Sequence, residues 1–194
     1  NLGNPCNRML YLAYNGLLPQ QFIEPTLQRI FDCGDSLGVR YEKYFEQMGI
    51  LRGREIVVKS DSPPISGRAD FLLTHEEHQE IVLELKSIND KGFKNLYSKP
   101  KPEHATQLQI YLQLLDKAYG IVLYENKNDQ KLKAFKVQRS PKEWNALVTR
   151  CNRIQQAVKI PTECTGQVWC ACRKYKEDED GREMDTNESI GESE

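Results

Sequence analysis

The sequence predicts an α/β fold in which a central mixed sheet is flanked by helices. The chain has 194 residues, of which 39% are hydrophobic and 28% charged, so it can build one domain with a sizeable core. Apolar residues at helical spacing mark some segments, and short apolar or alternating runs mark others. Their order is helices, three strands, a helix, two strands and a last helix, which is typical of a single mixed α/β domain.

Two helical segments come first. Residues 7–15 carry apolar side chains at helical spacing and end near Gly16. A longer segment, residues 25–48, has an apolar stripe at the same spacing, with Gly34 and Gly38 as candidate break points. We therefore expect a short helix and a long, interrupted one before the sheet.

Three strands follow, at residues 55–60, 67–73 and 80–87, because these runs are apolar and are separated by polar turns. The next segment, residues 90–102, has four lysines among two aromatic residues and shows no periodicity. It is expected to be a mobile basic loop.

The second half begins with a helix over residues 103–119 and continues with strands at 120–125 and 131–137. A capping box then opens the last long helix, since Ser140 is followed three positions later by Glu143. All of these elements fit within a predicted domain of residues 1–175.

Charge divides the chain at that point. Residues 176–194 contain nine acidic and two basic side chains, which leaves a basic excess in the remainder. We expect the last segment to be an acidic disordered tail, because it has few apolar residues. A basic body suits a polyanionic ligand such as DNA, although a solvated surface with a solubility tail is the alternative.

Asp70, Glu84 and Lys86 are the most informative side chains. Asp70 lies on the second predicted strand, and the other two lie on the third. If the hairpin turns near residues 76 and 77, Asp70 faces Glu84 with Cβ atoms roughly 4.5–5.5 Å apart. Alternation places Glu84 and Lys86 on one face of their strand. Buried charges are costly unless they are paired or bind a metal, so the pattern predicts a divalent-metal site.

This combination suits phosphodiester hydrolysis. Two carboxylates can hold Mg²⁺ or Mn²⁺, which activates a water molecule and neutralises charge on the attacked phosphate. A lysine two residues after the second carboxylate can orient or deprotonate that water and stabilise the transition state. The alternative is an ion-pair cluster on an exposed hairpin.

Three segments have the spacing of a known family: Gly67-Arg68-Ala69-Asp70, Glu84-Leu85-Lys86-Ser87 and Gln107-Leu108-Gln109-Ile110-Tyr111. On these segments the chain resembles the PD-(D/E)XK nuclease superfamily, in particular its RecB-like branch, which includes phage exonucleases and CRISPR-associated nucleases. The resemblance implies a single restriction-endonuclease-like domain. It also implies that Gln107 and Tyr111 contact DNA near the cleaved phosphate, although Tyr111 also suits a core position and Gln107 a surface one.

The resemblance further implies a metal site formed by Asp70, Glu84 and the Leu85 carbonyl, with Arg68 as a candidate phosphate contact. The chain departs from the family at Gly38, which stands where a metal-ligand histidine is expected. Either the remaining ligands suffice, with Glu42 one helical turn later as a candidate addition, or the site is weakened and the protein mainly binds DNA.

The chain has six cysteines and no recognisable secretory signal, which favours reduced thiols or metal ligands over disulfides. The resemblance implies a 4Fe–4S cluster held by one early and three late cysteines: Cys6, Cys164, Cys170 and Cys172. The spacing of the late cysteines differs from the family's, so zinc and free thiols remain alternatives. Cys33 and Cys151 fall on apolar helix faces and are expected in the core.

These observations lead to a metal-dependent DNA exonuclease of recombination, repair or CRISPR adaptation. The alternatives are a catalytically weak DNA-binding subunit of a larger complex and a restriction-type endonuclease. No apolar run approaches the roughly 20 residues of a membrane span, so we expect a cytoplasmic protein of a bacterial, archaeal or phage-infected cell, with DNA as its partner. A protein partner or a second copy of the chain is also expected.

Overall fold

A computed structural model describes residues 2–18, 23–75, 79–162, 164–166 and 170–175. The predicted acidic tail, residues 176–194, lies outside the described residues. The chain forms two compact units, each described by itself below. The first consists of Asn1–Gly3 and Ile23–Asn152, and the second of Asn4–Phe22 and Arg153–Glu194.

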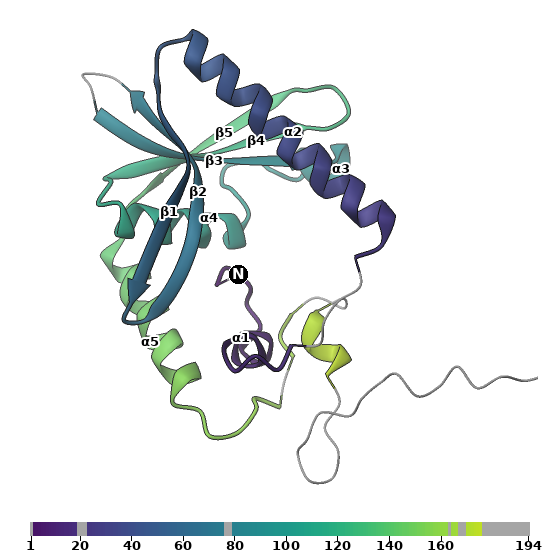
Figure 1. The fold of residues 1–194 in the computed structure, drawn as a ribbon, viewed down its shortest axis with the longest axis vertical. Helices are drawn as coiled ribbons and strands as arrows, with labels where there is room; N and C mark the ends of the chain where they lie inside the picture. The colour runs from purple at the N-terminus through teal and green to yellow at the C-terminus, as the bar shows by residue number, and fades with distance from the viewer. Residues whose placement is uncertain (1, 19–22, 76–78, 163, 167–169, 176–194) are drawn as a thin grey trace, which may run out of the picture. The chain divides into compact units, whose positions relative to one another are not determined.

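The first unit is built on a five-stranded sheet with strand order β1-β2-β3-β4-β5 (Figure 1). Only β3 and β4 pair in parallel, and the other neighbours are antiparallel, so the predicted mixed sheet is confirmed. The crossover between β3 and β4 contains α4, as a parallel connection requires. The strands are β1 (Leu51–Asp61), β2 (Pro64–His75), β3 (Gln79–Ile88), β4 (Tyr119–Asn126) and β5 (Leu132–Gln138).

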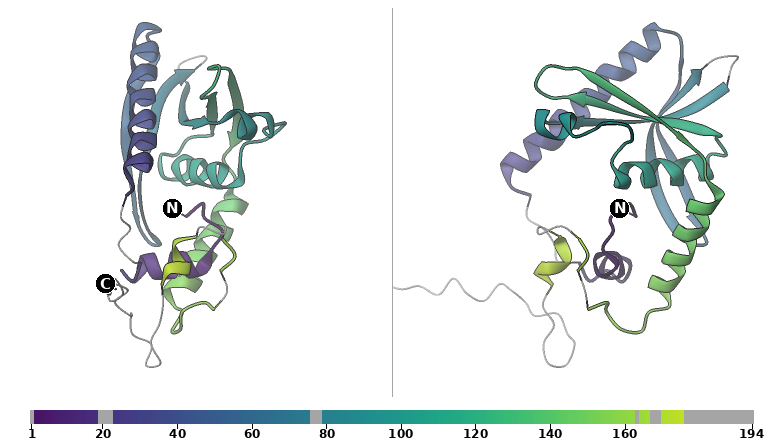
Figure 2. Two further views of the ribbon diagram at one scale, coloured as in Figure 1. Left: turned by 90° about the vertical axis from the view of Figure 1, so that its right-hand side faces the viewer. Right: turned by 180° about the vertical axis from the view of Figure 1, so that it is seen from behind.

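Helices cover both faces of this sheet (Figures 1 and 2). One face packs against α4 (Pro102–Leu114) and α5 (Pro141–Gln155) in a core that includes Val82. The other packs against the second half of α2 (Pro25–Gln47) in a core that includes Leu83. Successive residues of β3 thus enter different cores, and this strand is buried on both faces.

The long helix α2 differs from the prediction in two ways. It runs without interruption through Gly34 and Gly38, because the apolar stripe of its second half packs on the sheet and holds the helix straight. Its first half has no buried residue among those described, and Cys33 is exposed rather than in the core. Cys151, on α5, is buried as predicted.

The basic segment after β3 is also more ordered than expected. It begins with a short helix, α3 (Asp90–Lys94), which Asn89 caps by accepting a hydrogen bond from the Gly92 N–H. Phe93 is buried in the first core, and Lys133 of β5 donates hydrogen bonds to the Phe93 and Leu96 carbonyls. An apolar anchor and a lysine from another strand therefore fix a segment whose lysines alone predict mobility.

The predicted capping of α5 is confirmed on one side, where the Glu143 N–H donates to Ser140 Oγ at 3.3 Å. The second unit contains α1 (Asn7–Tyr14), as predicted, and a short 3₁₀ helix, η1 (Ala171–Lys174). Among the described residues, no helix has the length and apolar character to span a membrane.

Candidate nuclease site and metal centre

The site lies where β2 separates from β3. Backbone pairing between the two strands runs from His75 to Phe71, which is opposite Leu83. Continuing that register places Asp70 opposite Glu84, as the sequence predicts. At this point Asp70 contacts β3 through its side chain, because its Oδ2 accepts a hydrogen bond of 2.8 Å from the Leu85 N–H.

β2 also changes its packing at Asp70. Ala69 packs in the core beside α4, whereas Phe71 packs in the core beside α2. Residues two apart normally share one face of a strand, so the regular alternation is broken at the intervening acid. On the neighbouring strand β1, Glu55 has a positive φ of 52° and is opposite Asp70 by the same register. The two strands bend together beside the acid pair.

Glu84 is completely buried. Its Oε1 lies 2.5 Å from Lys86 Nζ, but the arrangement is that of an ion pair without hydrogen-bond geometry. Neither carboxylate oxygen of Glu84 accepts a hydrogen bond from any residue that the structure describes. Such a group is costly to bury in its charged form, so it either takes up a proton or gains a further cationic partner.

Burial also changes how the acids ionise. It raises the pKa of Glu84 to about 7, with a further contribution from the negative charge of Asp70. Burial likewise raises the pKa of Asp70, against the opposing effects of Lys86 and of the Leu85 N–H. Both changes oppose placing two negative charges side by side in the absence of a cation.

A cleft of about 480 Å³ opens beside these acids. Asp70, Leu85 and Lys86 line it, together with residues of α2 and β1. Three acids (Asp35, Glu55 and Asp70) and three basic side chains (Arg54, Lys86 and Lys127) line this cleft, so it can accept a hydrated or phosphate-bearing ligand.

Two residues of β1 in this cleft, Arg54 and Glu55, are absent from the sequence-based site. The charge of Glu55 raises the pKa of both Asp70 and Glu84, so it belongs to the same electrostatic site. The strand prediction begins at residue 55, and no motif includes either side chain. The register between β1 and β2, which pairs Arg54 with Phe71 and places Glu55 opposite Asp70, is needed to locate both side chains beside the site.

Gln107 and Tyr111 lie on one face of α4, as predicted, and Gln107 Nε2 donates to Tyr111 Oη at 2.9 Å. Tyr111 is a core residue, only 6% exposed. Burial raises its pKa to about 12, with smaller contributions from Glu84 and Asp70, so its hydroxyl stays protonated at neutral pH. A Cβ on Gly67 would lie 3.2 Å from the Tyr111 ring, which explains the glycine in the Gly-x-Ala-Asp segment.

Two other predicted residues lie in ion pairs. Arg68 is exposed, and its Nε lies 3.2 Å from Glu55 Oε2. Glu42 does not line the cleft, and its Oε2 accepts a hydrogen bond of 2.6 Å from Arg54 Nη1. Gly38 lies in the cleft wall, where an added Cβ would be 3.2 Å from Arg54 Nη2. An arginine thus lies against the position where the family's histidine is expected.

The acid pair fits a divalent cation. Oxygen ligands are those that Mg²⁺ and Mn²⁺ prefer, and Glu84 offers two buried oxygens without hydrogen-bond partners among the described residues. Asp70 keeps one oxygen, Oδ1, beyond its hydrogen bond to the Leu85 N–H. The residues present therefore fit the metal site that the sequence predicts.

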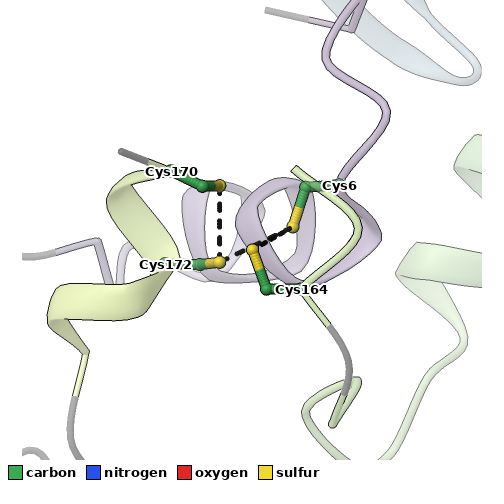
Figure 3. A group of neighbouring side chains, drawn as sticks. All are labelled: Cys6, Cys164, Cys170 and Cys172. Atoms are coloured by element: carbon green, nitrogen blue, oxygen red, sulfur yellow. Dashed lines mark hydrogen bonds between the residues drawn. The ribbon is translucent and has the colours of Figure 1, made fainter. Parts of the chain in front are cut away.

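The second unit brings together the four predicted cysteines (Figure 3). Cys6 precedes α1, and the other three come from the segment around η1. The Cys6 sulfur lies 3.8 Å from that of Cys164 and 3.6 Å from that of Cys172, and all four sulfurs lie within 4.8 Å of one another. None is in a disulfide, so the thiols converge as ligands would.

Their environment supports at least one thiolate. Burial raises the pKa of Cys6, but the Met9 N–H at the start of α1 and the neighbouring thiols lower it to about 7 overall. Burial raises the pKa of Cys170 and Cys172, so a bound cation would favour the thiolate form of both. Four thiolates suit either zinc or an iron–sulfur cluster.

The sulfur spacing distinguishes these two occupants. Zn–S bonds of about 2.3 Å in a tetrahedron place sulfurs about 3.8 Å apart, close to the present spacing. In a 4Fe–4S cluster each thiolate binds a different iron, so the sulfurs would have to move apart.

The chain resembles known proteins in part of its sequence and in its fold. No family model matches the chain. Over 72 residues, or 37% of the chain, it is 40% identical to the CRISPR-associated exonuclease Cas4 of Saccharolobus solfataricus, and the match covers 33% of that protein. The chain thus spans about one third of the length of this relative.

Three solved structures, of two proteins, share the fold. The crystal structure of SSO0001 has a TM-score of 0.54 at 20% identity, and the match covers 82% of this chain and 75% of that one. The alkaline exonuclease LHK-Exo of Laribacter hongkongensis has a TM-score of 0.53 at 19% identity, covering 77% and 76%. A second structure of LHK-Exo, in complex with dAMP, has a TM-score of 0.54. The predicted restriction-endonuclease-like fold is confirmed.

Proposed function

We propose that the chain is a member of the RecB-like branch of the PD-(D/E)XK nuclease superfamily and a metal-dependent deoxyribonuclease that degrades DNA from its ends; the partial match to Cas4 and the shared fold support this. One observation carries the proposal: a fully buried glutamate, whose carboxylate contacts Lys86 and has no other polar partner among the described residues, stands opposite a second acid that lines a cleft. The exonuclease relatives favour cleavage from ends over cleavage at internal sequences.

Asp70, Glu84 and the Leu85 carbonyl would hold Mg²⁺ or Mn²⁺. The ion supplies charge neutralisation and an acidified water molecule when it is bound. Lys86 lines the cleft with its ammonium beside Glu84, so it can orient the attacking water or stabilise negative charge on the phosphate. Asp70, fixed by the Leu85 N–H, keeps one oxygen in a defined position.

Gln107 and Tyr111 have a supporting role. The Gln107 amide donates to the Tyr111 oxygen, which leaves the hydroxyl proton of Tyr111 to be directed toward an acceptor in the site. Since Tyr111 is buried, we propose that it orients the acids or a phosphate oxygen from within the core. Arg68, exposed at the same edge, is a candidate contact for a more distant phosphate.

The proposal is tested with end-labelled linear DNA and covalently closed circular DNA in the presence of Mn²⁺. We expect degradation of the linear substrate only, with Asp70→Asn reducing the rate about 100-fold or more through loss of metal-assisted stabilisation. Lys86→Ala is expected to reduce the rate about 100-fold while leaving Mn²⁺ binding intact. Undiminished cleavage by the Asp70 variant would refute the mechanism.

The alternative function is a DNA-binding subunit with little activity. Gly38 favours it, since the position of a family metal ligand has no side chain. Binding of linear DNA by the native chain, with no cleavage in Mg²⁺, Mn²⁺ or Co²⁺, would establish this alternative. Cleavage of closed circular DNA at defined positions would instead indicate a restriction-type endonuclease.

We also propose that the four cysteines hold a structural metal centre. The present sulfur spacing matches a single zinc ion, whereas the family resemblance, with one early and three late cysteines, supports a 4Fe–4S cluster for which the sulfurs would move apart. Anaerobic purification followed by metal analysis and an absorption spectrum tests this. About four irons per chain indicate the cluster, and about one zinc indicates a single ion.

Two cysteine variants distinguish metal ligation from other effects of removing a thiol. Cys6→Ser is expected to lose most of the bound metal and to lower the thermal unfolding midpoint, because metal binding is coupled to folding. Cys33→Ser, at an exposed cysteine outside the group, is the matched control and should keep full metal content. Equal metal content in both variants would exclude the proposed centre.

We extend the proposal to the biological setting. DNA is the proposed partner, in recombination, repair or CRISPR adaptation within the cytoplasm. A second copy of the chain or another protein is the proposed source of any further contacts.

A further inference from the structure

We propose that Arg54 is a phosphate-binding residue of the nuclease cleft and that the absence of a side chain at Gly38 makes room for it. This inference rests on the proposed function, because it assigns a ligand contact within the same cleft. It assigns a role to a residue that lies outside the three segments on which the family resemblance depends.

Arg54 lies on β1 and lines the cleft, and one of its terminal nitrogens is fixed by a hydrogen bond. Its Nη1 donates to Glu42 Oε2 at 2.6 Å, and its side chain is 26% exposed. Glu42 is the only hydrogen-bond partner that the described residues give this guanidinium. A guanidinium has five N–H donors in a planar fork, so an anchored Arg54 still presents donors to the cleft.

The other terminal nitrogen, Nη2, lies against α2. An added Cβ at Gly38 would lie 3.2 Å from Arg54 Nη2 and 3.9 Å from its Cζ. Any side chain at this position, a histidine included, would require the Arg54 guanidinium to move from its present place. The residue that departs from the family pattern thus borders directly on the proposed phosphate-binding group.

The charges in the cleft explain why a cation is needed at this position. Asp70 and Glu84 repel a phosphate. Of the two lysines that line the cleft, Lys86 is paired with Glu84 beside the acids, and Lys127 is exposed. Arg54 is close enough to Asp70 to oppose the rise in its pKa, which places the guanidinium within electrostatic range of the acid pair. Guanidinium groups match phosphate geometry with two parallel hydrogen bonds. Arg54 is therefore suited to bind a phosphate of the DNA strand beside the metal site.

The test measures binding rather than cleavage. A fluorescein-labelled single-stranded oligonucleotide is titrated with the protein in Ca²⁺, with the label anisotropy as readout and at several salt concentrations. Arg54→Ala is expected to raise the Kd about tenfold. It should also reduce the magnitude of the slope of log K against log salt by about one, as expected for the loss of one phosphate contact. Arg54→Lys should recover the salt slope but only part of the affinity.

Two matched controls isolate the contact. Arg52→Ala removes the same charge from the same strand at an exposed position outside the cleft, and it should change the Kd less than about twofold. Glu42→Gln removes the anchoring charge but leaves the guanidinium, so it should weaken binding less than Arg54→Ala. Thermal unfolding of each variant verifies that the fold is retained.

The outcomes separate this inference from the proposed function. If the native chain and Arg54→Ala bind and cleave equally well, Arg54 has no phosphate contact, while the proposed nuclease stands. If Arg52→Ala and Arg54→Ala weaken binding equally, the effect is one of general charge and the specific contact is refuted. If the native chain binds no DNA in any divalent ion, both the proposed function and this inference fail.

Discussion

Glu84 is a carboxylate that folding removes entirely from water. Its pKa is about 7 in the folded chain without metal, against an ordinary value of 4.5. Between these two values the folded state binds more protons than the unfolded state, so the free energy of unfolding falls as the pH rises. The destabilisation is absent below about pH 4.5 and complete above about pH 7.

Glu84→Gln is therefore expected to stabilise the metal-free protein at neutral and alkaline pH. In EDTA the gain in the free energy of unfolding should reach the order of 3 kcal/mol at about pH 8, relative to its value near pH 4.5. Urea denaturation across this pH range measures it. The comparison between two pH values cancels the constant cost of a buried amide.

Glu80→Gln is the matched control, because Glu80 lies on the same strand, is 38% exposed and pairs with Lys117. Its effect on the free energy of unfolding should be small at every pH, as for other partly exposed ion pairs. A Glu84→Gln curve parallel to that of the native chain would contradict the assignment. Saturating Mn²⁺ should reverse the order, since only the native glutamate gains from the ion.

At the scale of single elements, α2 offers a direct comparison between two glycines. Gly34 has no atom within 4 Å of an added Cβ, whereas Gly38 has the Arg54 guanidinium at 3.2 Å. Gly34→Ala is expected to raise the free energy of unfolding by roughly 0.5–1 kcal/mol, because alanine restricts the unfolded chain. Gly38→Ala should gain less, because Arg54 must shift by a few tenths of an ångström.

Chemical denaturation of the two alanine variants checks this, with Arg54→Ala/Gly38→Ala as the third member of the comparison. Removing the guanidinium should restore the full gain at position 38. Equal gains at both glycines in the presence of Arg54 would show that the guanidinium does not press on the helix.

The sequence predicted every strand and long helix, but its errors follow a pattern. β1 begins at Leu51, four residues before its predicted start at residue 55, because its first residues pair with β2. α4 ends at Leu114, five residues before its predicted end at residue 119, because Tyr119 begins the strand that pairs with β3. Partners distant in the sequence, which no local pattern contains, decide these ends.

At the scale of the molecule, the predicted site divides into local and distant parts. Asp70, Glu84 and Lys86 lie on one hairpin, so a short window of sequence determines their meeting. Arg54 and Glu55 enter the cleft from another strand, and only the three-strand register reveals them. The four cysteines were predicted from their number and residue type. Their spacing along the chain does not determine how close they lie in the folded protein.

The distance along the chain between Cys6 and its partners has a consequence for synthesis. Cys164 follows Cys6 by 158 residues, and Asn152, the last residue of the first unit, is made before Cys164. At about 5–20 residues per second, the first thiol waits on the order of ten seconds or more before its partners leave the ribosome. The hairpin with the acids can form during that interval. Metal insertion at the proposed cysteine centre would thus be a late step of maturation, and a chain interrupted before residue 164 would carry the acidic cleft without the ligands of that centre.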